Sequence, residues 1–404
     1  MKKAIFLLSC ILLLSLFAGC SNNGSAPSLK PSAPAASSGA SSKPTDSSSS
    51  PAAEEPELDI SRIYGLSPDG EEATLSTALN LTQEDLAKIA EGNYRVAICM
   101  HQVDNDVNAM KVDIIKKVLA NSGVEVITVT DGQSSVEQMV NNLETVISMK
   151  PDLIISIAYD VNAMVPIFQQ VRDAGIKLVF FECAPTGFVP GKDYYALVST
   201  DYFGSGRFAA EYMAYSLNYE GTVGMVYYDA DVWTCNERDQ AFRDVMAKYP
   251  GIEIVMEAGF ADPNQTGTTA DAILAQYPDI DGIYTTWDTP ADETIASAKA
   301  VGRDDLIITT VDLGENSARV IAEGGMIKAV GAARSFEDGE TIANAALYAL
   351  LEKNLAHRYI ATPTQGVTQE NVLDAYAGCF NVKPPDSLIK VWEAATGKTW
   401  TSPF

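Results

Sequence analysis

The chain contains 404 residues, of which 47% are hydrophobic and 20% charged, and its formal net charge at pH 7 is −25. This acidity argues against the clustered Lys and Arg that nucleic acids and anionic lipid surfaces require, so we expect neither as a partner. The length is too great for one ordinary hydrophobic core, and we therefore expect more than one domain.

The N-terminus is typical of an export signal. Two lysines precede an apolar run over residues 4–18, which is shorter than the stretch of about 20 residues that a membrane helix needs. The run ends in Leu-Phe-Ala-Gly before Cys20, a motif that resembles a bacterial lipobox. We therefore predict a signal peptide over 1–19 and lipidation of Cys20, whose acyl chains would anchor an extracytoplasmic protein to the cell membrane. An ordinary signal peptide with an incidental cysteine is the alternative.

Two segments are expected before the first strand. Residues 20–56 consist mainly of Ser, Ala, Pro and Gly without apolar periodicity, so we predict a disordered, lipid-anchored linker with a reach of about 30 Å. Residues 57–93 are predicted to be an N-terminal extension with a helix, because Thr82 and Asp85 are spaced as in a helix cap and Gly92 closes the apolar pattern.

From residue 94 onward, short β-branched runs alternate with helical stretches, as in βαβ units around a parallel sheet. The predicted strands are 95–100, 124–129, 152–158, 177–182 and 195–200, followed in the same order by 222–228, 252–257, 281–287, 306–312 and 327–333. The two sets are offset by a nearly constant number of residues, 127 from Pro151 to Pro278. The sequence therefore predicts an α/β fold of two similar, doubly wound parallel-sheet lobes, with a ligand cleft at the carboxyl ends of the strands.

Residues 94 to about 380 resemble the ribose-type, or type I, periplasmic sugar-binding proteins of ABC importers. The resemblance rests on phrases that occur in the family's order, namely PDLIISIAYD, AGIKLVFFECAPTG, STDYFGSGRFAAEYM, NERDQAF, WDTPADETIASAKAVG, ITTVDLG and GGMIKAVGAARSFEDG. It implies three crossings between the lobes that act as a hinge. Lobe 1 would comprise 94–199 and 334–361, lobe 2 would comprise 200–333 and 362–380, and 381–404 would be a C-terminal tail.

Polar residues after the first and fourth predicted strands are the candidate ligand contacts in lobe 1. The resemblance implies contacts at His101 and Asn105, for which a solvated loop is the alternative. Glu182 matches a family aspartate that accepts hydrogen bonds from sugar hydroxyls, and a carboxylate can accept two at once. Cys183 stands where the ribose binders have arginine.

The remaining candidates lie in lobe 2 and at the last crossing. Asn236 replaces a family arginine, and Asp312 matches a family aspartate. Trp287 and Asp288 stand at the family's Asn-Asp, where an aromatic face can lie against a sugar ring. The alternatives are a Trp in the core and an Asp that caps a helix. Arg334, beside the family's glutamine position, would contact the ligand or form a structural ion pair.

Three further residues are weaker candidates. Arg238 could reach the ligand, although an ion pair on the helix surface is at least as plausible. Trp233 and Phe260 lie on predicted cleft loops, and simple packing is the alternative for both. The sequence does not decide whether the four cysteines after Cys20 pair with one another.

Motifs for catalysis are absent from the sequence. The chain has no GxSxG, Walker A, GxGxxG or HExxH motif and contains two histidines. A calcium-like run from Asp104 lacks the required Gly and Glu, because Ala109 and Ile115 stand in their places. We therefore predict no enzyme, no cofactor and no metal, although paired carboxylates across a cleft leave hydrolysis open.

The sequence thus predicts a substrate-binding lipoprotein of an ABC importer that captures a sugar or sugar-like solute between its lobes. Hinge closure would bury the solute, and the closed, monomeric form would dock on a membrane permease. Two alternatives remain open. One is a nucleoside-binding lipoprotein, and the other is a sensory protein that hands its ligand to a receptor.

Overall fold

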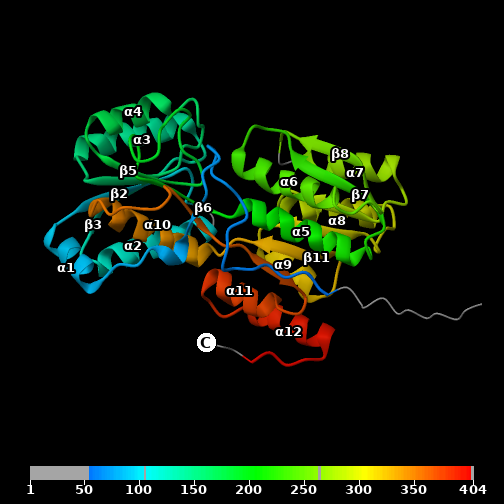
Figure 1. Cartoon of the computed structure of the whole chain (residues 1–404). Helices are drawn as coiled ribbons and strands as arrows, with labels where there is room; N and C mark the ends of the chain where they lie inside the picture. Colours follow the sequence, from blue (N-terminus) through cyan, green and yellow to red (C-terminus); the bar gives the residue numbers. More distant parts are fainter. Residues whose placement is uncertain (1–53, 104–105, 263–264, 402–404) are drawn as a thin grey trace, which may run out of the picture. The chain divides into compact units, whose positions relative to one another are not determined.

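A computed structural model describes residues 54–103, 106–262 and 265–401 (Figure 1). The predicted signal peptide, Cys20, most of the predicted linker and Asn105 lie outside these residues. The described residues belong to one compact unit, Ala53–Phe404. None of the helices in this described part is both long and apolar enough to cross a membrane.

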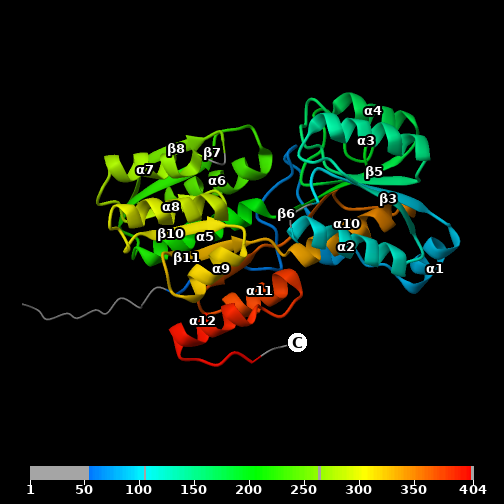
Figure 2. The same ribbon diagram turned by 180° about the vertical axis from the view of Figure 1, so that it is seen from behind.

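The first sheet has seven parallel strands in the order β1-β12-β6-β5-β4-β2-β3. Its strands are β1 (Thr74–Leu75), β2 (Arg95–Met100), β3 (Glu125–Asp131), β4 (Leu153–Ser156), β5 (Lys177–Phe181), β6 (Ala196–Thr200) and β12 (Tyr359–Thr362). Its helices are α1 (Gln83–Glu91), α2 (Asp106–Asn121), α3 (Val136–Met149), α4 (Val165–Asp173) and α10 (Ser335–Leu350). Helices α3 and α4 cover one face of the sheet, and α2 and α10 cover the other (Figures 1 and 2).

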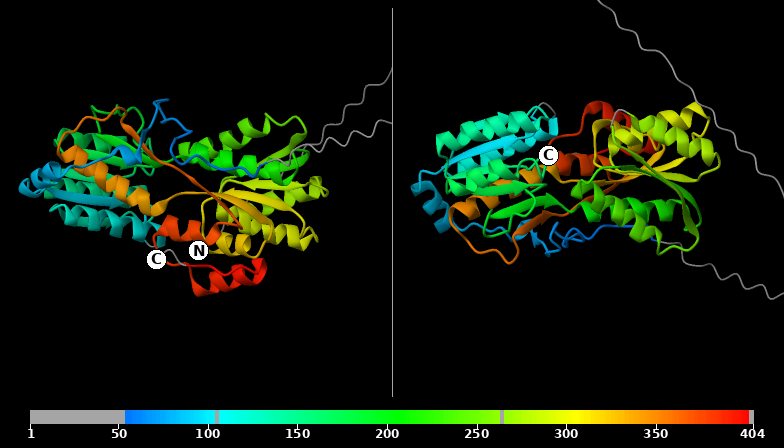
Figure 3. Two further views of the ribbon diagram at one scale, coloured as in Figure 1. Left: turned by 60° about the horizontal axis from the view of Figure 1, so that its bottom comes forward. Right: turned by 90° about the horizontal axis from the view of Figure 1, so that it is seen from above.

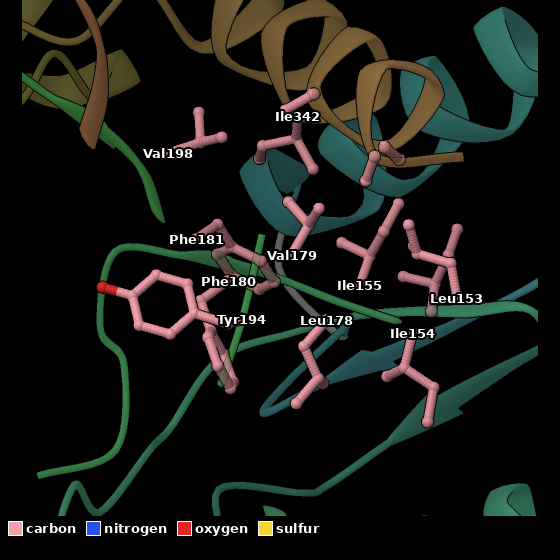
Figure 4. Packing of buried hydrophobic residues seen from close by; sticks show 14 of the residues in the cluster. Leu153, Ile154, Ile155, Leu178, Val179, Phe180, Phe181, Tyr194, Val198 and Ile342 are labelled. Atoms are coloured by element: carbon pink, nitrogen blue, oxygen red, sulfur yellow. The ribbon is translucent and has the colours of Figure 1, made fainter. Parts of the chain in front are cut away.

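The centre of this sheet is apolar on both faces. All residues of β4 are buried, as are four of the five residues of β5. Their side chains alternate between the two helix layers, and Ile342 of α10 packs over one of them (Figure 4). Burial on both faces explains why these strands are continuous hydrophobic runs in the sequence instead of alternating patterns.

The second sheet has six strands in the order β13-β11-β10-β9-β7-β8, and only its edge strand β13 is antiparallel to its neighbour. Its strands are β7 (Gly221–Tyr228), β8 (Ile252–Phe260), β9 (Gly282–Thr285), β10 (Ile307–Val311), β11 (Ile327–Ala332) and β13 (Gln365–Thr368). Its helices are α5 (Tyr202–Ser216), α6 (Trp233–Met246), α7 (Thr266–Gln276), α8 (Asp288–Ala300), α9 (Glu315–Ala322), α11 (Val372–Phe380) and α12 (Asp386–Thr396). Both α11 and α12 pack on α9 (Figure 3).

The predicted fold class is confirmed, because each of the ten predicted strands has a counterpart in one of the two sheets. The sequence did not predict β1, β12, β13 or α12. Helix α12 lies within the segment that we expected to be a tail, and its Leu388 and Trp392 are buried against the core of the second sheet. The four cysteines of the described residues are free thiols.

The chain passes between the sheets after β6, between β11 and β12, and again between β12 and β13. Buried polar groups join these crossings. The Asp338 carboxylate accepts hydrogen bonds from the hydroxyls of Thr200 and Thr362. The Thr364 hydroxyl donates to the Asp201 carbonyl at 2.7 Å. These bonds satisfy groups that would otherwise be buried at a free-energy cost.

The N-terminal extension is tied to both sheets. Strand β1 pairs with β12, and α1 begins with a capping box in which Thr82 and Asp85 exchange hydrogen bonds. The backbone amides of Tyr64 and Gly65 donate hydrogen bonds of 2.7 and 2.9 Å to the carboxylate of Asp201, the residue directly before α5. The same carboxylate caps α5, so one residue holds the extension against the first crossing.

Candidate functional site

A buried ion pair lies at the carboxyl end of β5. Lys111, the sixth residue of α2, has a side chain that is 7% exposed, and its Nζ lies 2.8 Å from Glu182 Oε1. Glu182 directly follows β5 and has a left-handed backbone with φ 59°. Burial alone would raise the pKa of Glu182, but the charge and hydrogen bond of Lys111 outweigh it and hold that pKa below its ordinary value of 4.5.

A second ion pair occupies the corresponding place in the other half of the repeat. Arg238, the sixth residue of α6, has a side chain that is 7% exposed, and its Nη1 lies 3.0 Å from Asp312 Oδ2. Asp312 directly follows β10 and also has a left-handed backbone, with φ 66°. The other arm of the guanidinium, Nη2, donates to Cys235 Sγ at 3.1 Å.

Each pair leaves one carboxylate oxygen uncommitted. Lys111 engages Oε1 of Glu182, and Arg238 engages Oδ2 of Asp312. Within the described residues, Oε2 of Glu182 and Oδ1 of Asp312 have no hydrogen bond. Each carboxylate can therefore accept a hydrogen bond from a ligand while its negative charge stays compensated by a buried cation.

Electrostatic coupling links the two pairs across the two sheets. The pKa of Glu182 responds to the charge of Arg238, and the pKa of Lys111 responds to the charge of Asp312. Tyr202, at the start of α5, is half-buried, and its partial burial together with the charges of Glu182 and Asp312 raises its pKa well above the ordinary value. The structure therefore brings Glu182 and Asp312 into one cluster.

Trp287 borders this cluster as a half-buried aromatic wall. Its ring packs edge-to-face on Tyr228 and Phe260, with ring centroids 5.5 and 5.1 Å apart. The guanidinium carbon of Arg238 lies 5.6 Å from the Trp287 ring. The side chain thus joins the core of the second sheet on one side and the ion pair on the other.

Asp288 is the first residue of α8 and lies close to Asp312. Burial, together with the negative charge of Asp312, raises the pKa of Asp288 to about 7. A carboxyl with this pKa is partly protonated at neutral pH, so it can donate as well as accept a hydrogen bond. Its place at a helix N-terminus favours the charged form and opposes this shift.

His101 lies at the end of β2, near Glu182. Its ring stacks on Tyr159 with centroids 5.4 Å apart and planes inclined by 11°. Burial lowers the pKa of His101, so the ring is neutral at physiological pH. Its Nδ1 is buried without a hydrogen-bond partner in the described part of the chain.

Two predicted residues are not brought to the cluster. Asn236 is exposed on α6, and its Nδ2 donates to Asp231 Oδ1 at 3.2 Å. Arg334 precedes α10 and pairs with Glu337, with Nη1 2.7 Å from Oε2. Among the described residues, neither side chain forms a contact with either ion pair of the cluster.

Sequence reasoning missed Lys111 and gave Arg238 too little weight. Both are mid-helix cations, which usually lie on the surface, whereas here both are buried. One signal could have found them. Lys111 and Arg238 are 127 residues apart, the spacing of the internal repeat. Two cations in equivalent places of a repeat indicate a shared role.

A cavity of about 480 Å³ lies next to the cluster. It is lined by the loops after β4 and β5, by the residues before α6, and by Trp233. Trp233 belongs to the helix that follows β7, yet it packs against the core of the first sheet. The cavity therefore has walls from both halves of the repeat.

A family model described as periplasmic binding protein domain matches residues 96–354, which is more than half of the chain. The chain belongs to this family. Periplasmic binding proteins bind solutes for transport without converting them, and they work outside the cytoplasm. The match contains both ion pairs, so these lie in the part of the chain that defines the family.

Solved structures support the fold of this periplasmic binding protein. An ABC transporter solute-binding protein from Bacillus halodurans C-125 with bound myo-inositol is 23% identical, with a TM-score of 0.61 over 71% of this chain and 98% of that chain. One from Agrobacterium vitis with bound α-D-tagatopyranose is 21% identical, with a TM-score of 0.62 over 71% and 98%. A 5-methylthioribose transporter solute-binding protein from Thermotoga lettingae TMO is 19% identical, with a TM-score of 0.59 over 76% and 95%.

Proposed function

We propose that this protein is the substrate-binding lipoprotein of an ABC importer and that it captures a neutral sugar or polyol between its two sheets. The observation that carries this proposal is the pair of compensated carboxylates, Glu182 and Asp312, each with one free oxygen. Sugar hydroxyls donate well to such oxygens. The ligands named for the similar structures, myo-inositol and tagatopyranose, are neutral polyhydroxy compounds, which supports the same class here.

Because the two buried cations are already paired, they favour a ligand without charge. Lys111 and Arg238 are buried and already paired, so an anionic solute would have to displace a carboxylate to reach them. A cationic solute would meet two carboxylates whose charges are already compensated. A neutral polyol only needs hydrogen bonds, and the cluster offers these from Glu182, Asp312, Asp288 and His101.

The remaining predicted contacts belong to the proposal as well. Trp287 would provide an aromatic face for the C–H side of the ring. Asn236 and Arg334 would contact the ligand only after the two sheets move, because neither contacts the ion pairs in this structure. Asn105, outside the described residues, is proposed to lie on the same loop as His101.

The proposed mechanism is capture followed by closure. A solute that contacts both lobes favours the closed state, since it binds that state better than the open one. Closure would exclude water, so that each hydroxyl needs a protein partner and an analogue lacking one leaves a buried group unpaired. The closed monomer would then dock on a permease, while diacylation of Cys20 would keep the protein at the membrane.

A thermal-shift screen with the full mature chain tests the ligand class. It would include pentoses, hexoses, inositols and nucleosides, each with a phosphorylated counterpart. We expect at least one neutral polyol to raise the melting temperature, because a ligand at 100 times its Kd stabilises the folded state by about 2.7 kcal/mol. Stabilisation by phosphorylated compounds alone would contradict the proposal. Loss of uptake of the same solute in cells lacking the gene would separate an importer from a sensory protein.

A further inference from the structure

The cavity beside the ion pairs has an apolar wall that no part of the proposed hydroxyl recognition uses. Its volume is about 480 Å³, within the range of about 300 to 1,000 Å³ typical of small-molecule pockets. Its apolar lining includes Tyr159, Val161, Ala184, Phe188, Leu197 and Trp233. The cavity is therefore large enough, and its wall apolar enough, to hold a ring-sized group.

The cavity lining is linked to both ion pairs through neighbouring residues, although none of the four paired residues is itself part of that lining. On one side, Tyr159 stacks on His101, and Cys183 directly follows Glu182. On the other side, Trp233 begins the helix that carries Arg238, and Cys235 between them accepts a hydrogen bond from that guanidinium. The lining thus includes the residue that follows Glu182 and the first residue of the helix that carries Arg238.

The charges around the cavity restrict what enters it. Three carboxylates line it, those of Asp69, Asp160 and Asp231, and none of the described residues that form its lining is basic. An anionic substituent would be repelled and would find no cation to compensate it. Apolar surface, by contrast, is stabilised by burial at about 25 cal/mol per Å².

We propose that this cavity is a subsite for an apolar, ring-sized substituent, so that the solute is a neutral glycoside and not a free sugar. The proposal rests on the proposed function, since the sugar ring is held by Glu182 and Asp312. Tyr159 follows β4 of the first sheet and Trp233 begins α6 of the second half, so each half contributes an aromatic side chain to the lining, and Ala184 contributes a small one. A nucleoside is one such glycoside, with the base as its substituent.

The test compares matched pairs of ligands on the full mature chain. D-ribose, D-glucose and D-galactose are each measured beside their phenyl β-D-glycosides, and adenosine and uridine are added to the ribose series. Isothermal titration gives the ratio of the two dissociation constants within each pair. We expect the substituted member of at least one pair to bind about tenfold more tightly or better, as for a buried aromatic contact.

Three variants identify the cavity as the cause. Trp233→Ala removes a wall and Ala184→Leu fills the space, so both should reduce that ratio towards one. Trp400→Ala is the matched control, because Trp400 lies at the C-terminal end, where it bonds to Asp374, and should leave the ratio unchanged. Circular dichroism checks that each variant is folded. If Trp233→Ala does not fold, the ratio measured for Ala184→Leu tests the subsite alone.

The outcomes separate the two proposals. If free sugars bind as tightly as their glycosides, or if Ala184→Leu leaves the ratio unchanged, the subsite is overturned while the sugar-binding function stands. If neither series binds, and no neutral polyol of the thermal-shift screen does either, the proposed function is overturned and the subsite with it.

Discussion

Glu182 and Asp312 share a left-handed backbone, with φ values of 59° and 66°, each directly after a strand of a different sheet. Residues other than glycine rarely adopt this conformation, and it persists only where the surroundings fix it. Here a neighbouring strand fixes each one, because the Glu182 amide donates to Val198 and the Asp312 amide donates to Gly331. Two matched carboxylates in a costly conformation indicate a selected, shared function.

Removing one member of the first pair should destabilise the protein. Lys111→Met leaves the half-buried Glu182 carboxylate without its cation, and we expect a loss of about 1 to 3 kcal/mol in the free energy of unfolding. The double variant with Glu182→Gln should recover part of this loss. Urea unfolding at pH 7 measures both.

The control for this experiment is Lys177→Met, which removes an exposed ion pair of the same length, 2.8 Å, to Glu352. An exposed pair contributes under about 1 kcal/mol, so this variant should be nearly neutral. The pKa of Glu182 is lowered in the folded state, so its contribution is present above the ordinary value of 4.5 and is lost as pH falls through the folded pKa. Equal effects of the two lysine variants at pH 7 would refute a structural role for the buried pair.

Asp312 and Trp287 should both carry affinity once a ligand is found. Asp312→Asn weakens the acceptor and leaves Arg238 buried without its counter-charge, and Trp287→Ala removes the aromatic face. We expect each to weaken binding by about 1 to 3 kcal/mol in isothermal titration. Trp400→Ala serves again as the control. Unchanged affinity in both folded variants would show that the ligand binds elsewhere.

The fold was largely predictable because its signal is local. Strands buried on both faces must be apolar along their whole length, so β4, β5, β9 and β10 were visible as hydrophobic runs. Strands β1, β12 and β13 have two to four residues, and β1 and β13 lie at the edges of their sheets. Their pairing depends on partners far away in the chain, which sequence periodicity does not report.

The site was predictable only in part, for a similar reason. Glu182 and Asp312 could be identified because the carboxyl ends of parallel strands face the cleft. Lys111 and Arg238 could not, because burial of a helical cation depends on tertiary packing and leaves little local trace. The spacing of the two cations within the repeat was the available signal, and only the structure showed that both are buried and paired with carboxylates.

Asp288 should make stability depend on pH. Its folded pKa of about 7 lies above the ordinary value of 3.8, so the folded protein binds this proton more tightly than the unfolded chain does. Asp288 therefore lowers stability as pH rises from about 4 towards 7, and the penalty is fully present above that window. Asp288→Asn should raise the urea midpoint at pH 8 more than at pH 5.

A control for this variant is Asp271→Asn, which removes an acidic charge from an exposed position of α7. It should shift both midpoints by similar, small amounts. If Asp288→Asn behaves in the same way, or stabilises more at pH 5, burial does not govern the titration of this carboxyl.

Cys20 is predicted to carry the lipid anchor, on the basis of the short apolar run and the small residues before it. Cys20→Ala should move the protein from the membrane fraction to the soluble fraction, because two or more acyl chains are needed for stable anchoring. Membrane fractionation with immunoblotting measures this. A variant that stays with the membrane would require another anchor.

Ligand should draw the two sheets together. The three crossings of the chain between the sheets provide a hinge, and a solute that contacts both Glu182 and Asp312 favours the state in which they lie closest. For a chain that begins at Glu57, which omits the predicted linker, solution scattering should therefore give a smaller radius of gyration with saturating ligand than without it. A sugar that fails to bind, added at the same concentration, controls for solvent contrast, and Asp312→Asn at the same ligand concentration should show a smaller change. A scattering curve that stays the same at saturation would mean that the lobes do not move or that the ligand contacts only one of them, and capture by closure would then be wrong.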